Sequence, residues 1–101
     1  MIVVSNRFNV AEGHEEQFVE RFRESTGGVE DREGFVRFEL QTPVKGDTYA
    51  VTTYWESMED FEAWTDSEEF ERAHAREAPE GMFEGHPELE IHEVAFERTR
   101  D

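Results

Sequence analysis

Apolar and polar side chains alternate along the first ten residues of the chain. One face of this segment carries the apolar residues Ile2, Val4, Phe8 and Val10, whereas the other face is mostly polar. A hydrophobic period of two is typical of a strand that is buried on one side. The pattern therefore predicts a strand over residues 2–10, which Gly13 ends.

The hydrophobic period then changes to that of a helix. Between residues 14 and 25, apolar positions recur at helical spacing among Glu and Arg, and two consecutive glycines end the run. The apolar positions are Phe18, Val19 and Phe22. We expect an amphipathic helix here, with its apolar side packed against another part of the fold.

Two further strands are predicted in the middle of the chain. Residues 35–41 alternate apolar and polar side chains, and residues 48–55 are dense in β-branched and aromatic types. The residues from Pro43 to Asp47 favour a turn. We therefore expect the two strands to form a hairpin.

A pair of short helices is predicted after the hairpin. Ser57 and Asp60 have the spacing of a helix cap, and an apolar stripe follows at Met58, Phe61 and Trp64. Asp66 and Ser67 can cap a second helix, which Pro79 and Gly81 would end. The apolar side of that second helix carries Phe70, Ala73 and, unexpectedly, His74.

The last part of the chain returns to strand character. Residues 80–88 hold two glycines and a proline, so we expect a loop there. Residues 89–97 read as a strand in which Leu89 and Ile91 are out of phase with Val94 and Phe96. A bulge near Glu93 would place both pairs on one face.

The predicted order β-α-β-β-α-β is that of an α+β ferredoxin-like fold, formed by residues 1–101 as a single domain. Helices then cover one face of an antiparallel sheet and leave the other face open. Residues 49–55 carry apolar side chains on both sides. We therefore expect a homodimer in which a second copy of the chain covers the open face.

The composition excludes several classes of function. The chain has 26 Asp plus Glu against 10 Lys plus Arg, a formal charge of -16, which would repel nucleic-acid phosphates and anionic membranes. No apolar run approaches the roughly 20 residues that cross a bilayer, and the first residues lack the basic segment of a signal peptide. Cysteine is absent, which excludes disulfides and thiolate ligands. We expect a soluble, cytoplasmic protein with no nucleic-acid or membrane partner.

The acidity also favours a saline environment. Lys45 is the only lysine, and the acidic residues are spread along the whole chain. At 1 M salt the Debye length falls to about 3 Å, so the repulsion between like charges is screened. We hypothesise a halophilic source.

Asn6 is the first candidate for a functional residue. It falls in phase with the apolar side chains of the first strand. A buried amide without hydrogen bonds costs on the order of 1 to 3 kcal/mol. Asn6 therefore either bonds a neighbouring strand or loop, or directs a polar group into a pocket.

His74 is the second candidate. It lies one helical turn after Phe70, between two alanines. A histidine on an apolar face is often a core residue, but small neighbours leave space beside the ring, and neutral imidazole is a common axial ligand of haem iron. The other histidines show no metal-ligand spacing and are expected to be surface or structural residues: His14, His86 and His92.

Trp64 is the third candidate, although it could equally be a core aromatic residue. At about 100° per residue, Trp64 and His74 lie roughly 80° apart on one straight helix. They converge on one site only if the helix bends between Thr65 and Ser67, where the capping residues predict a break.

Four segments together resemble one family. They are WESMEDFEAWTDSEEFERAHA at 55–75, SNRFNV at 5–10, ERF at 20–22 and EGF at 33–35. The chain resembles the antibiotic biosynthesis monooxygenase (ABM) superfamily and, within it, the IsdG-like haem-degrading monooxygenases. This resemblance covers nearly the whole chain. It implies a ferredoxin-like homodimer, a dimeric α+β barrel, with one haem per protomer between helices and sheet.

The resemblance also implies roles for particular residues. His74 would ligate haem iron, Asn6 would donate a hydrogen bond near the distal oxygen, and Trp64 would press on the porphyrin and favour its distortion. Phe22 matches an aromatic residue of the pocket wall, and Arg21 is a candidate for a propionate contact. Haem would be substrate and cofactor together, opened with O2 and electrons from an external reductase, with release of iron.

Two other functions stay open at this point. One is cofactor-independent oxidation of a quinol or polyketide-like aromatic, with Asn6 and Trp64 activating the substrate and His74 as acid or base. The other is a non-enzymatic dimer that binds haem without degrading it. The Glu-rich stretch at residues 77–90 shows no family motif, and its role is unassigned.

Overall fold

The computed structural model describes residues 1–75 and 80–100 of the chain. The elements follow the predicted order, with one short 3-10 helix, η1, that the sequence pattern did not predict. They are β1 (Ile2–Phe8), α1 (Glu15–Glu24), η1 (Val29–Asp31), β2 (Phe35–Gln41), β3 (Tyr49–Trp55), α2 (Met58–Thr65), α3 (Glu68–Ala75) and β4 (Glu88–Glu93).

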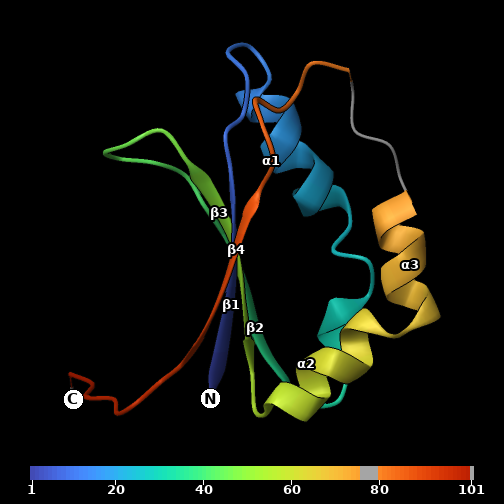
Figure 1. Ribbon diagram of the computed structural model, residues 1–101, viewed down its shortest axis with the longest axis vertical. Helices are drawn as coiled ribbons and strands as arrows, with labels where there is room; N and C mark the ends of the chain where they lie inside the picture. The colour runs from blue at the N-terminus through green and yellow to red at the C-terminus, as the bar shows by residue number, and fades with distance from the viewer. Residues whose placement is uncertain (76–79, 101) are drawn as a thin grey trace.

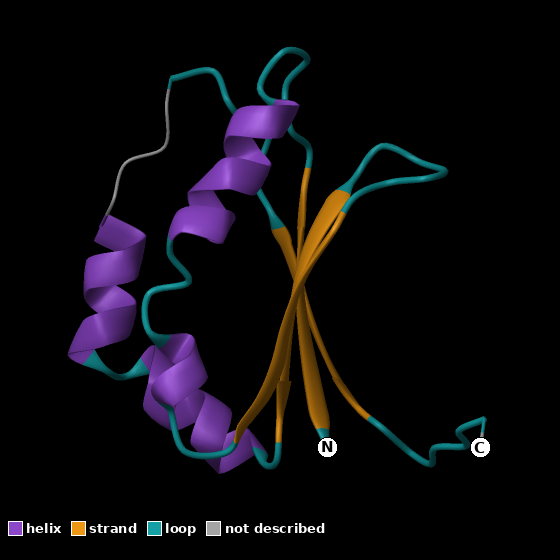
Figure 2. Cartoon of the chain, turned by 180° about the vertical axis from the view of Figure 1, so that it is seen from behind, coloured by secondary structure: helices purple, strands orange, loops and turns teal. Residues whose placement is uncertain are grey.

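The four strands form one antiparallel sheet in the order β2-β3-β1-β4. Figure 1 and Figure 2 show that α1, α2 and α3 all lie on the same side of this sheet. The arrangement confirms the α+β ferredoxin-like fold. None of the helices in the described part of the chain combines the length and the apolar character that a bilayer crossing requires.

Two apolar clusters attach the helices to opposite ends of β1. At the first end, Ile2 and Val4 pack with Trp55, Val29 and Trp64. At the second end, Phe18 of α1 is fully buried, which contributes about 1.5–3 kcal/mol. Four aromatic rings surround Phe18, with centroids 5.3 to 5.7 Å from its own: Phe8, Phe22, Tyr49 and Phe83. The two clusters hold α1 and α2 apart along the sheet.

The break between α2 and α3 is where the capping residues predict it. The Ser57 hydroxyl accepts a hydrogen bond from the Asp60 amide at 3.2 Å, and the Ser67 hydroxyl accepts one from the Phe70 amide at 3.1 Å. Each serine satisfies an amide that a helix leaves without an internal partner at its start. The predicted two short helices are therefore confirmed. The predicted end at Pro79 lies outside the described residues.

The predicted strand over 89–97 is confirmed for residues 89–93, but its continuation to residue 97 and the bulge near Glu93 are wrong. Strand β4 ends at Glu93. The Val94 amide still donates a hydrogen bond to the Met1 carbonyl oxygen at 2.9 Å, but Val94 is not part of the strand. The physical reason is the register: Glu93 pairs with Ile2, the first residue of β1, so no partner strand remains beyond it. Phe96 is 72% exposed. An irregularity occurs instead in β2, between Phe35 and Arg37.

The predicted loop at 80–88 contains a core residue that the pattern did not reveal. Met82 is fully buried, and its carbonyl oxygen accepts a hydrogen bond from the Ala11 amide at 2.7 Å. The Glu84 amide donates to the carbonyl oxygen of Asn9 at 2.8 Å. These bonds attach the segment to the end of β1 and fix the position of Phe83.

The face of the sheet opposite the helices is covered by no other element of the described chain (Figure 2). The composition of 49–55 suggests an apolar surface here. The face instead carries polar side chains, which form hydrogen bonds with one another. Ser5 lies 3.3 Å from Thr52 through their hydroxyl oxygens, and the Tyr54 hydroxyl donates to the Glu39 carboxylate at 3.1 Å.

Candidate functional site

A cavity of about 700 Å³ lies between the helices and the sheet. Strands β1, β2 and β3 form its floor, with side chains that point to the helix side by strand alternation. The floor residues are Val4, Asn6, Phe8, Phe38, Val51 and Thr53. Helices α1, α2 and α3 and the loop after α1 form its walls.

All five residues predicted for the site line this cavity: Asn6, Arg21, Phe22, Trp64 and His74. They come from β1, α1, α2 and α3, so only the tertiary fold brings them together. The break between α2 and α3 allows Trp64 and His74 to reach the same space. Their roles stay predictions.

The imidazole of His74 is held in one tautomer. Its Nδ1 lies 2.9 Å from the Phe70 carbonyl oxygen. A carbonyl oxygen can only accept, so Nδ1 donates, and in the neutral imidazole Nε2 then keeps its lone pair. The ring stacks on the Phe70 ring, with 3.9 Å between centroids. His74 is exposed rather than buried, so it is not a core histidine, and Nε2 is available to an iron or to a proton.

Asn6 is half-buried in β1, where it pairs with Val51 on one side and Leu89 on the other. Among the described residues, no side chain or backbone group forms a hydrogen bond with its amide side chain. The alternative that Asn6 bonds a neighbouring strand or loop therefore has no support in the described chain. Its amide can donate to a ligand in the cavity.

Trp64 belongs both to the core and to the cavity. It is 6% exposed and packs in the cluster around Ile2, and its ring meets the Phe70 ring edge-on at 5.6 Å. The loop after α1 approaches it closely: a Cβ at Gly27 would lie 3.7 Å from the Trp64 ring and 2.7 Å from the Ala73 Cβ. The indole thus has little freedom to move away from the cavity.

The charges at the cavity differ from those of the whole chain. Among residues 1–75 and 80–100, two arginines line it, Arg21 and Arg72, against one acid, Glu69. Arg72 makes exposed ion pairs with Glu68 at 3.7 Å and with Glu69 at 3.9 Å. In a chain of formal charge -16, the described lining of the cavity therefore carries charges of both signs, with Arg72 already paired with acids.

The lining includes further residues that the sequence pattern did not assign to the site, among them Thr53, Arg72, Phe83 and Leu89. The last two belong to the stretch 77–90 that had no assigned role, and they now form part of the cavity wall. Thr53 could have been found from the strand pattern, since it lies two residues before buried Trp55 and therefore points to the same face. Its hydroxyl oxygen accepts a hydrogen bond from the Trp55 indole at 2.9 Å.

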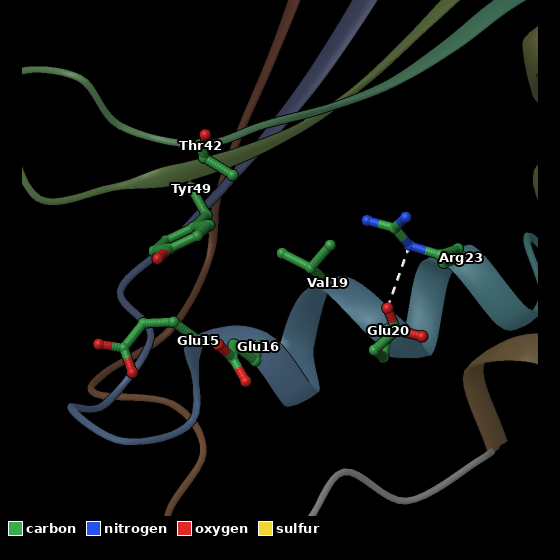
Figure 3. Close-up of a pocket in the computed structure, with 7 residues that line it drawn as sticks. All are labelled: Glu15, Glu16, Val19, Glu20, Arg23, Thr42 and Tyr49. Carbon is green, nitrogen blue, oxygen red and sulfur yellow. Dashed lines mark ion pairs between the residues drawn. The ribbon is translucent and has the colours of Figure 1, made fainter.

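A second, smaller hollow of about 310 Å³ lies between α1 and the β2–β3 hairpin. Figure 3 shows its lining, in which Thr42 and Tyr49 lie on one side and residues of α1 on the other, and Arg23 pairs with Glu20 at 3.1 Å. Throughout residues 1–75 and 80–100, no group of three or more His, Asp or Glu residues could hold a metal ion.

The fold and the cavity together define a ferredoxin-like protein with a large, mostly apolar cavity between its helices and its sheet. Residues 1–76 match the family model of the antibiotic biosynthesis monooxygenases, and the chain belongs to this family. It is therefore an oxidoreductase of the monooxygenase type.

Similar proteins support the same assignment. A heme-degrading monooxygenase of Halalkalibacterium halodurans is 34% identical over 97% of this chain and 85% of the relative. A staphylobilin-producing heme oxygenase of Staphylococcus haemolyticus is 40% identical over 73% of each chain. The structure of MhuD, the heme-degrader of Mycobacterium tuberculosis, with two hemes bound in its active site, superposes with a TM-score of 0.82 at 33% identity, covering 98% of this chain and 100% of MhuD.

Proposed function

We propose that this protein is a haem-degrading monooxygenase, which binds haem in the cavity and opens the porphyrin with O2 and external electrons, releasing iron. One observation carries the proposal: His74 lines a largely apolar cavity with its Nε2 lone pair unused, beside Asn6 and Trp64. The haem-degrading function of relatives at 34% and 40% identity supports it.

The lining residues suit haem in three respects. The apolar floor and walls match the macrocycle, the imidazole of His74 matches the iron, and Arg21 matches a propionate. When bound, haem supplies the iron that activates O2. The chain itself would ligate through His74, orient the distal oxygen through the Asn6 amide, and press on the ring through Trp64, with Phe22 as a wall.

We further propose a homodimer in the cytoplasm, supplied with electrons by a separate reductase. A second copy would cover the face of the sheet that the helices leave open (Figure 1). An exposed apolar side chain just beyond β4 supports a contact with that second copy: Phe96 is 72% exposed among the described residues.

A titration of the purified apoprotein with hemin tests the proposal. We expect a Soret band for the wild type and for His92→Ala, whose exposed side chain lies on the outer side of β4 beside Glu90. His74→Ala should lose the band or shift it strongly. Ascorbate or a reductase added under air should then bleach the wild-type band.

The other outcomes point to the other functions. No Soret band, with His74→Ala indistinguishable from the wild type, would reject haem as ligand and favour a cofactor-independent oxidation. A band that persists with reductant under air would leave a haem-binding protein without degrading activity.

A further inference from the structure

We propose that Ser67 is a positioning residue, whose hydroxyl group fixes Trp64 and His74 relative to each other across the break between α2 and α3. The proposal rests on the proposed function for the roles of Trp64 and His74. Ser67 itself does not line the cavity.

The Ser67 hydroxyl connects the end of one helix to the start of the next. Its oxygen donates to the Trp64 carbonyl oxygen at 2.7 Å and accepts from the Phe70 amide at 3.1 Å. The Ser67 amide also donates to the Trp64 carbonyl oxygen, at 3.1 Å. One side chain therefore ties the backbone of Trp64 to the backbone of Phe70.

Phe70 passes this constraint to His74. Its carbonyl oxygen accepts the hydrogen bond from His74 Nδ1 at 2.9 Å, and its ring lies between the two site residues. The Phe70 ring stacks on the imidazole and meets the Trp64 indole edge-on, with interplanar angles of 29° and 87°. The position of Phe70 thus determines both the tautomer of His74 and the distance between imidazole and indole.

An ordinary helix cap does not need the bond that the Ser67 hydroxyl donates to the Trp64 carbonyl oxygen of the preceding helix. Ser57 caps α2 by accepting from the Asp60 amide, but its hydroxyl donates to the Asp60 carboxylate rather than to a preceding helix. Ser57 is also absent from the cavity lining. Ser57→Ala is therefore a matched control, since it removes a cap of the same kind from the same pair of helices.

The experiment compares Ser67→Ala, Ser67→Thr and Ser57→Ala by two readouts. Nitrogen-15 NMR of the apoprotein reports the tautomer of His74 without haem. A hemin titration then reports affinity from the Soret band. Urea unfolding tests whether the two alanine variants are folded and similarly destabilised.

We expect Ser67→Ala to populate the Nε2–H tautomer of His74. It should also bind hemin about fivefold more weakly, which corresponds to the net free energy of roughly one hydrogen bond. Ser67→Thr, which keeps the hydroxyl, should resemble the wild type, and so should Ser57→Ala in both readouts. If Ser67→Ala and Ser57→Ala give the same tautomer and the same hemin affinity, the proposal is wrong.

The two proposals can fail separately. If the wild type binds no hemin, the proposed function fails, and the tautomer of His74 in the apoprotein still decides the role of Ser67. If the wild type binds and bleaches hemin but Ser67→Ala matches Ser57→Ala, only the positioning role fails.

Discussion

Asn6 and His74 reach the cavity from different sides, one from the sheet and the other from α3, and they differ in which of their polar atoms are engaged. His74 uses Nδ1 within its own helix, whereas the Asn6 amide forms no hydrogen bond among the described residues. His74 is thus suited to hold an iron in a fixed orientation, and Asn6 to donate to a group that arrives with the ligand.

We predict that Asn6→Ala binds hemin but degrades it slowly. The substitution removes a donor at the reacting oxygen and leaves His74 in place, so the rate of Soret bleaching should fall on the order of 10²-fold. Asn9→Ala, an exposed position just beyond β1, is the control. Equal bleaching rates in Asn6→Ala and Asn9→Ala would exclude a role for the Asn6 amide.

Sequence reasoning found the residues that break a local pattern. Asn6 stands out because it is polar in an apolar phase, and His74 because it lies on the apolar side of an acidic helix. Phe83 could not be found in this way, since its place depends on backbone bonds between residues 82–84 and 9–11. Long-range pairing of this kind leaves no periodicity in a Gly-rich segment.

Among the elements, the loop between α1 and η1 controls how closely α3 can approach the rest of the fold. Gly27 has a φ of +76°, which L side chains rarely adopt, and it faces Ala73 and Trp64. Gly28, the next residue, has a φ of +83° but no heavy atom within 4 Å of a Cβ built on it. A substitution at either glycine strains the backbone, but only one at Gly27 also contacts the site. Comparing the two therefore separates these effects.

We predict that Gly27→Ala weakens hemin binding and Gly28→Ala does not. Both variants should lose about 1–2 kcal/mol of unfolding free energy from the left-handed backbone, and Gly27→Ala must lose more because its Cβ overlaps that of Ala73. Only this overlap moves α3 and its His74. Urea unfolding and Soret titration of both variants measure the two effects, and equal hemin affinity in the two variants would contradict the prediction.

The outer face of the sheet holds a carboxylate that depends on its neighbours. Burial alone would raise the pKa of Glu39, but hydrogen bonds from Gln41, Tyr54 and Arg37 outweigh it and hold the pKa below the ordinary value of 4.5. Burial, together with the bond to this carboxylate, raises the pKa of Tyr54 above 10.0. The ionised Glu39 and the neutral Tyr54 are thus the stable pair at neutral pH.

A pH dependence of stability follows for Glu39. Because its pKa is lowered by folding, its contribution is present above about pH 4.5 and is lost as the pH falls through the folded-state value. Glu39→Gln should therefore be less stable than the wild type at pH 7, by about 1 kcal/mol or less, and the difference should shrink toward pH 4. Urea unfolding at both pH values measures this, with the exposed Glu33→Gln as control. A difference that is the same at both pH values would contradict it.

The element order was predictable because each helix and hairpin carries its own local signals. Ser57 and Ser67 marked both helix starts, and the alternation over 35–41 gave the bounds of β2 as observed. The end of β4 was not predictable, because it depends on where β1 begins. Val94 and Phe96 look like strand residues but have no strand to pair with.

At the scale of the whole molecule, the acidic surface and the cavity differ in their balance of charged residues. The chain carries a formal charge of -16, whereas the described part of the cavity lining holds two arginines and one glutamate. Haem propionates are anionic, so the acidic surface opposes their approach in dilute buffer, whereas Arg21 at the cavity is the predicted partner of a propionate. High salt screens the first effect over distances beyond about 3 Å at 1 M and weakens close contacts less.

We therefore predict that stability and hemin affinity both rise from dilute buffer to molar KCl. The urea midpoint should increase because screening removes repulsion among the carboxylates, and the hemin dissociation constant should fall for the same reason. Equal urea midpoints would refute the proposed adaptation to salt. An affinity that falls steeply as KCl is added would show that the arginines, rather than the acidic coat, control binding.

The central claim is that this protein opens haem with O2. The most direct test is a single turnover of the hemin complex with ascorbate under 18O2, with catalase present to remove free peroxide and an iron chelator to capture released iron. We predict an open tetrapyrrole that carries label from 18O2, formed together with chelated iron, and no such product from His74→Ala. Recovery of intact protoporphyrin with its iron, or a ring-opened product that disappears when catalase is added, would contradict the claim.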